Sequence, residues 1–218
     1  MSEEAGPGPE APRRARPPVV GLLGGVAAGK STVAGMLRDE GALVLDADEL
    51  AHEALEDPGV KRTLVDRFGG DILDARGAVD RRALGRIVFG SGDSRALEEL
   101  EALVHPIVRE RILQVLEESP DLRPAPPLIV LDVPLLLESS LASHCDRLLF
   151  IAADPQRRRL QGRSRHGWSP EEIERREARQ ADVAAKKRAA DLVIENSGTL
   201  EDLRERVRSI FAILTARP

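Results

Sequence analysis

The hydrophobic positions follow two patterns: short apolar runs, and longer stretches with helical spacing. The apolar runs lie at residues 19–23, 43–45, 128–133 (interrupted by Asp132), 148–152 and 192–194. Each has the length of a buried strand. Between the first two runs, Val33, Met36 and Leu37 have the spacing of a helix, and Gly41 is placed to end it. Strand, glycine-rich loop, helix and strand form a βαβ unit, and so the pattern predicts a parallel sheet covered on both faces.

The stretch from about 49 to 118 has helical spacing throughout. Asp80 is placed to cap a helix over 81–89. Apolar positions between 93 and 119 are spaced for one buried face, and we expect Pro106 to bend or break that helix. The chain therefore predicts an all-helical insertion within an α/β core.

The stretch after the fourth apolar run is rich in arginine and very polar. Its first part, residues 156–165, contains five arginines: Arg157, Arg158, Arg159, Arg163 and Arg165. Residues 169–172, SPEE, then have the signals that begin a long helix. We expect a mobile segment here, and a terminal amphipathic helix capped by residues 199–202.

Composition narrows the class of protein. The chain has 218 residues, of which 42% are hydrophobic and 32% charged, as in a soluble globular protein. No apolar run approaches the roughly 20 residues that span a bilayer. The net charge of −5 and the few aromatic residues argue against nucleic-acid binding. We expect a cytoplasmic protein with no membrane or nucleic-acid partner, and a monomer, with weak oligomer formation as the alternative.

Two smaller features agree with this class. Cys145 is the single cysteine and cannot form an internal disulfide, which fits a reducing compartment. Residues 1–17 are rich in proline, glycine, alanine and charge and have no apolar core of a signal peptide. We expect a disordered tail, with a downstream start of the protein as the alternative.

Residues 24–31, GGVAAGKS, match the phosphate-binding P-loop pattern, between a strand and a helix as that motif requires. Glycines let backbone N–H groups surround phosphate oxygens, and the helix N-terminus adds positive charge. We expect Lys30 to bridge the β- and γ-phosphates of ATP and Ser31 to hold Mg²⁺. The expected nucleotide-binding residues are Gly25, Val26, Ala27, Ala28, Gly29, Lys30, Ser31 and Thr32. No N-K-x-D or L-S-G-G-Q motif is present, which leaves the small-molecule kinases.

Polar residues follow two of the strands at the edge where ligands of parallel sheets bind. Asp46 and Asp48 follow the second strand. One of them could accept the proton of an attacking hydroxyl and the other could cap the next helix, and we favour Asp48 as the base. Asp132 ends the third strand and is the expected second magnesium ligand, with a structural polar residue as the alternative.

Arginines on a closing lid often stabilise the charge of a transferred phosphoryl group. Arg159 and Arg163 are four residues apart and would share one helix face, so we expect these two to be catalytic. The alternative is a solvated helix face in an arginine-rich chain.

From about residue 19 to 210 the chain resembles the dephospho-CoA kinase family. The matching segments, in the family's order, are VVGLLGGVAAGKSTVA, GALVLDADELAHEAL, RRALGRIVF, ALVHPIVRERI, VLDVPLLLES, DPQRRRLQGR and AADLVIENSG. The resemblance implies transfer of the ATP γ-phosphate to the ribose 3′-hydroxyl of dephospho-CoA, with magnesium. It also implies Asp48 as the base and places Asn196 near the adenine, although Asn196 could instead be a turn residue.

The expected fold is therefore an α/β P-loop NTPase: a three-layer core with a parallel five-stranded sheet, a helical substrate-binding insertion and an arginine-rich helical lid. The core would comprise residues 18–52, 125–155 and 186–218, the substrate domain 53–124 and the lid 156–185. Ala27 and Ala28 depart from the family's Gly-Ser, and alanine adopts positive φ less readily than glycine. The alternatives are another small-molecule or nucleoside monophosphate kinase, and a non-catalytic ATP-binding switch protein.

Overall fold

The computed structural model describes residues 16–90, 94–178, 180 and 182–216. Its centre is one sheet of five parallel strands in the order β2-β3-β1-β4-β5. The strands are β1 (Val19–Gly24), β2 (Leu43–Asp46), β3 (Ile129–Asp132), β4 (Arg147–Ala152) and β5 (Leu192–Glu195). The predicted parallel sheet of five strands is confirmed. Of the predicted tail, residues 1–15 lie outside the described part.

Strand β1 lies at the middle of the sheet and is buried along its whole length. It pairs with β3 through Val20 and Val130, and with β4 through Gly21 and Leu148. Strands covered on both faces consist of almost continuous apolar residues, which is why the runs were visible in the sequence.

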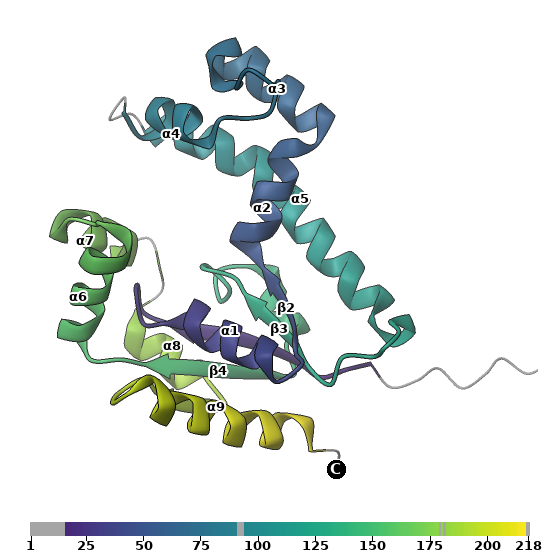
Figure 1. Ribbon diagram of the computed structural model, residues 1–218, viewed down its shortest axis with the longest axis vertical. Helices are drawn as coiled ribbons and strands as arrows, with labels where there is room; N and C mark the ends of the chain where they lie inside the picture. The colour runs from purple at the N-terminus through teal and green to yellow at the C-terminus, as the bar shows by residue number, and fades with distance from the viewer. Residues whose placement is uncertain (1–15, 91–93, 179, 181, 217–218) are drawn as a thin grey trace, which may run out of the picture.

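Helices cover both faces of the sheet, which confirms the expected three layers (Figure 1). Helices α1 (Lys30–Asp39) and α9 (Leu200–Thr215) pack against each other and bury Leu37 and Val207 on one face. Thr199 caps α9 through a reciprocal capping box with Asp202, as predicted. The other face is covered by α8 (Val183–Ala189) and by the apolar faces of α2 (Ala47–Glu56) and α5 (Ser94–Glu118).

The insertion stands above the strand ends in Figure 1 as four α-helices. They are α2 (Ala47–Glu56), α3 (Pro58–Phe68), α4 (Arg81–Gly90) and α5 (Ser94–Glu118). The expectation of helix throughout was wrong for residues 69–80, which hold a short 3₁₀ helix and an antiparallel bridge from Leu73 to Val79. Asp80 caps α4 as predicted, because its carboxylate accepts from the N–H groups of Arg82 and Ala83 at 2.8 and 3.2 Å.

Pro106 lies inside α5, and the helix continues past it, so of the predicted bend or break the break was wrong. A proline removes one hydrogen bond of a helix. Val104, Val108 and Ile112 on either side are buried in the main apolar cluster, and α5 packs along α2. Tertiary packing thus holds the two halves of α5 as one helix.

The arginine-rich segment forms α6 (Pro155–His166) and α7 (Pro170–Ala178), which lie together beside the sheet (Figure 1). Ser169 accepts from the N–H of Glu172 at 3.2 Å, so the predicted helix start is confirmed. The predicted long helix was wrong, because α7 ends at Ala178 and Asp182 caps the separate helix α8. A second capping aspartate favours a new helix start over continuation of the first helix.

Candidate active site

The P-loop connects β1 to α1 and has two residues with positive φ, Ala27 at 55° and Gly29 at 96°. The left-handed region costs an alanine roughly 1–2 kcal/mol, whereas glycine adopts it freely. Ala27 stands where the family has glycine, and the loop keeps its turn there at the cost of backbone strain.

Asn196 follows β5 and is buried, with only 4% of its surface exposed. Its Nδ2 donates a hydrogen bond to the main-chain oxygen of Ala28 at 2.8 Å. A Cβ added at Gly29 would lie 2.4 Å from the same Nδ2. Asn196 thus supports the P-loop from behind, and Gly29 is required there because a side chain would collide with it.

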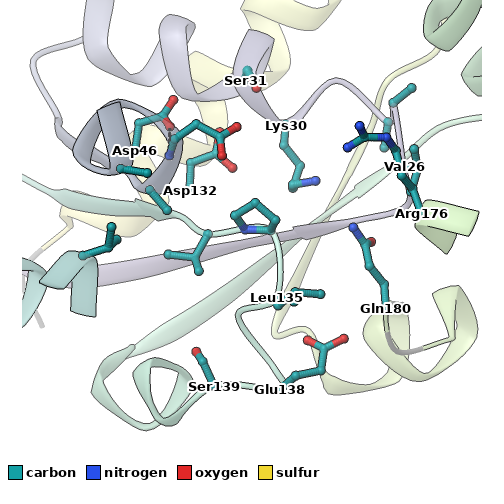
Figure 2. A pocket seen from close by; sticks show the side chains of 18 of the residues that line it. Val26, Lys30, Ser31, Asp46, Asp132, Leu135, Glu138, Ser139, Arg176 and Gln180 are labelled. Carbon is teal, nitrogen blue, oxygen red and sulfur yellow. Dashed lines mark hydrogen bonds between the residues drawn. The ribbon is translucent and has the colours of Figure 1, made fainter. Parts of the chain in front are cut away.

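The P-loop forms one wall of a cavity of about 750 Å³ at the carboxyl ends of the strands. The other walls come from α5, from the loop after β3 and from the α6–α7 segment. Residues that line those walls include Glu101, His105, Arg109, Glu138, Ser139, Gln161, Trp168, Arg176 and Gln180. Figure 2 shows side chains from the P-loop, from the loop after β3 and from the region of α7 pointing into the same space.

The two aspartates after β2 have different roles in the structure. Asp46 is the N-cap of α2, since its Oδ1 accepts from the N–H groups of Asp48 and Glu49 at 2.8 and 3.2 Å. Asp48 lies in the first turn of α2, is exposed, and lines the cavity. From the sequence, either aspartate could cap the helix and the other could act as the base. In the structure the cap is Asp46, which leaves Asp48 for the role of base.

Asp132 is almost fully buried, with 6% of its surface exposed. Burial raises the pKa of this carboxyl to about 6, Lys30 opposes the rise, nearby Asp46 and Asp48 add to it, and a hydrogen bond with Ser31 lowers it. The P-loop lysine and serine thus act directly on the carboxyl at the end of β3. In Figure 2, Asp46 and Asp132 lie next to each other, with Lys30 across the cavity.

The carboxylate oxygens of Asp132 and the hydroxyl oxygen of Ser31 suit a hard cation such as Mg²⁺, which prefers carboxylate, hydroxyl, water and phosphate oxygens. Among the described residues, however, no group of three or more His, Cys, Asp or Glu side chains could hold an ion. A magnesium ion here would need water and nucleotide phosphate for most of its ligands, as is usual for this ion.

The α6–α7 segment brings different arginines to the P-loop from those expected. Arg159 and Arg163 are exposed, and neither lines the cavity. Arg158 forms an ion pair with Glu177 and has a side chain that is only 12% exposed. Its guanidinium lies against Gly25, where an added Cβ would be 2.4 Å away. Successive helix residues point about 100° apart, so one residue of register decides which arginine faces the loop.

Arg176 on α7 lines the cavity, and its guanidinium lies 4.3 Å from the ring centroid of Trp168. Arg109 from α5 lines the opposite wall and donates from Nε to Ser140 Oγ at 2.8 Å. His105 is exposed and also lines the cavity. Arg176 lies outside the arginine run noted in the sequence, whereas Arg109 and His105 lie in the family-like segment ALVHPIVRERI. Nothing in their sequence pattern indicated that these three residues line one cavity.

Comparisons with known proteins agree on one family. The family model described as dephospho-CoA kinase matches residues 18–202. Dephospho-CoA kinase of Symbiobacterium thermophilum is 43% identical over 197 residues, covering 88% of this chain and 80% of that protein. Dephospho-CoA kinase of Geobacillus kaustophilus is 42% identical over 199 residues, covering 89% and 94%.

Two solved structures share the fold of this chain. The crystal structure of TT1252 from Thermus thermophilus is 37% identical, with a TM-score of 0.71 over 93% of this chain and 100% of that chain. Dephospho-CoA kinase from Campylobacter jejuni is 23% identical and shares the fold, with a TM-score of 0.67 over 92% and 98%. In the part of the chain that the structure describes, no helix is long and apolar enough to span a bilayer.

Proposed function

The chain belongs to the dephospho-CoA kinase family, a family of phosphotransferases that phosphorylate dephospho-CoA with ATP to give CoA, and we propose how its residues divide that work. The observation that carries the proposal is the single cavity in which the P-loop, Asp48 and Asp132 meet the walls from α5 and the lid.

The P-loop binds the phosphates of ATP. Its N–H groups and the start of α1 surround the β-phosphate, and Lys30 contacts the β- and γ-phosphates. Asn196 holds the loop in shape through Ala28. Its position behind the loop also supports the expected place of the adenine beside the end of β5.

Asp48 is the general base. It accepts the proton of the ribose 3′-hydroxyl as the 3′-oxygen attacks the γ-phosphorus. The bond between that phosphorus and the β–γ bridging oxygen breaks, and ADP leaves with the electron pair. The support is that Asp48 lines the cavity while Asp46 is occupied as the helix cap.

Ser31 and Asp132 are the residues that would hold Mg²⁺. Their hydroxyl and carboxylate oxygens fit that ion, and Asp132 needs a cation nearby because it is buried. When bound, the ion neutralises charge on the nucleotide phosphates. Lys30 already supplies part of the positive charge that the buried Asp132 needs, since it lowers the pKa of Asp132.

Arg158 and Arg176 stabilise the charge of the transferred phosphoryl group from the lid side. Both lie at the P-loop or the cavity without any movement of α6. The predicted contact of Arg159 and Arg163 with phosphate would need α6 to rotate, and it stays a prediction.

The helical region 53–124 forms the acceptor side, the stretch 156–185 the lid, and the remaining segments the core. Arg109 and His105 on α5 provide a cation and a hydrogen-bonding ring for an acceptor that carries a diphosphate. The enzyme acts on small molecules, as a cytoplasmic monomer with no membrane or nucleic-acid partner.

The test is ADP release from purified protein with magnesium and ATP, with and without dephospho-CoA. We expect release to depend on dephospho-CoA and CoA to appear in equal amount. AMP and adenosine serve as competing acceptors, and faster release with AMP would instead support a nucleoside monophosphate kinase. Slow release that no acceptor accelerates would support a non-catalytic ATP-binding protein.

A further inference from the structure

Lys186 is a buried lysine for which the mechanism above has no use. Only 3% of its surface is exposed, and the other buried polar or charged residues of the described chain are Ser119, Asp132 and Asn196. It lies on α8, which packs against β1 and β4 under the cavity. Burying an ammonium group is costly unless it is paired or hydrogen-bonded, so its partners should be informative.

The ammonium of Lys186 donates to Oε1 of Gln180 at 2.8 Å. An ammonium group can only donate, whereas a carboxamide has one accepting oxygen and one donating NH₂ group. The oxygen of Gln180 must therefore face Lys186, and its Nε2 must point elsewhere. Lys186 thus fixes which end of the Gln180 side chain is presented to the rest of the site.

Gln180 lines the cavity, and its NH₂ group is the end that Lys186 does not hold. Figure 2 shows the Gln180 side chain extending from the lid side toward the P-loop, with its nitrogen on the side of Lys30. Arg176 and Glu138 line the same cavity on either side of it. The donor is therefore directed at the space where Lys30 and the P-loop would hold phosphate.

The charges around Lys186 agree with an anion bound nearby. Burial lowers the pKa of Lys186, Glu138 opposes that change, and Lys30 adds to it. Lys186 and Lys30 thus repel each other. An anionic group between them would relieve that repulsion.

We propose that Gln180 is a further substrate-binding residue of this kinase, donating from Nε2 to an oxygen of the ATP γ-phosphate, and that Lys186 is the positioning residue that fixes this orientation. The proposal rests on the function given above and extends it to the segment between α7 and α8. Because Gln180 follows the lid helices, this hydrogen bond would also connect the lid to the bound nucleotide.

The test compares two substitutions at position 180 and one at 186. Gln180→Ala removes the donor, and Gln180→Glu keeps the shape and the contact with Lys186 but presents a carboxylate oxygen to the phosphate. We expect Gln180→Ala to lower kcat/KM for ATP about tenfold, the loss typical of one hydrogen bond to a charged group. Gln180→Glu should be worse than Gln180→Ala, because like charges then face each other.

Lys186→Met should lower kcat/KM about as much as Gln180→Ala, since it releases the carboxamide to rotate. The double variant should be no worse than either single variant, because both remove the same interaction. Lys187→Met is the matched control: Lys187 is adjacent and exposed, and its loss should leave the kinetics unchanged. Thermal unfolding of every variant checks that each is folded.

A Gln180→Glu enzyme as active as wild type, or more active than Gln180→Ala, would overturn the proposal. So would a double variant whose loss is the product of the two single losses. If Lys186→Met does not fold, the comparison at position 180 decides, because that side chain is partly exposed. Turnover of the wild-type enzyme with dephospho-CoA tests the proposed function separately. If the wild type shows no turnover, the ATP dissociation constants of the same variants, measured by Trp168 fluorescence, still test the role of Gln180.

Discussion

Asn196 donates its side-chain hydrogen bond to the main-chain oxygen of Ala28, 168 residues earlier in the chain. Asn196→Ala leaves this carbonyl without its buried donor, which costs roughly 1–3 kcal/mol. We expect a lower free energy of unfolding in urea and weaker ATP binding. Ser197→Ala, at the exposed neighbouring position, is the control and should change neither. Unchanged stability of Asn196→Ala would show that the P-loop holds its shape without this bond.

Ala27 and Ala28 should respond oppositely to glycine. At Ala27, glycine relieves the positive φ, a gain of roughly 1–2 kcal/mol that is partly offset by the greater freedom of the unfolded chain. At Ala28, which is buried and not among the residues with positive φ, glycine brings no such gain and should destabilise by about 1 kcal/mol. Urea unfolding of the two variants measures the contrast. Equal destabilisation by both would contradict the strained turn.

Asp132→Asn should stabilise the nucleotide-free protein at alkaline pH while lowering activity. The pKa of Asp132 is about 6 in the folded protein against 3.8 as its ordinary value, so the folded state binds the proton more tightly. This group therefore makes wild type more stable as pH falls, by about 1.5 kcal/mol between pH 8 and pH 5. The advantage of Asp132→Asn should shrink over that range in magnesium-free urea titrations. A pH-independent difference would show that the carboxyl is not the cause.

Substitutions of Asp48 and Asp46 should affect different properties, turnover at Asp48 and stability at Asp46. Asp48→Asn removes the proposed base and should lower kcat by about 100-fold or more, with little change in ATP affinity. Asp46→Ala removes the helix cap and should lower the free energy of unfolding by about 1 kcal/mol. Stopped-flow turnover and thermal unfolding of both variants give the comparison. Undiminished turnover of Asp48→Asn would disprove the base assignment.

Arg158 and Arg159 provide a matched pair on one helix. Arg158→Ala should lower kcat by roughly tenfold or more, since its guanidinium lies at Gly25 and removing a charged partner costs about 1.5–3 kcal/mol. Arg159→Ala should have a small effect, because that side chain is exposed and away from the cavity. A larger loss for Arg159→Ala would restore the assignment made from the sequence.

The sheet and the P-loop could be predicted because their signals are local. Apolar runs such as that of β1 reflect burial on both faces, and the spacing of the loop glycines reflects contact with phosphate. The same holds for the caps at Asp80 and Thr199, each of which is encoded within a few residues of the helix that it begins.

The remaining walls of the cavity could not be predicted because they depend on packing between distant segments. The exposed side of α6 and the side toward the P-loop carry the same kind of residue, so composition did not distinguish Arg158 from Arg159. Likewise, the role of a single glutamine such as Gln180 can be recognised only from its hydrogen bond with Lys186 in the folded protein. The continuation of α5 through Pro106 depends on α2, which local propensity does not include.

The position of Asp48 at the base of α2 has a mechanical consequence. Its helix runs for ten residues, about 15 Å, from the sheet into the helical region, and Asp46 anchors the lower end through two backbone hydrogen bonds. A tilt of about 10° would move the upper end by between 2 and 3 Å, yet would hardly displace the first turn. Any swing of the helical region of this size would thus leave the Asp48 carboxylate, at the pivot, at nearly the same distance from the P-loop.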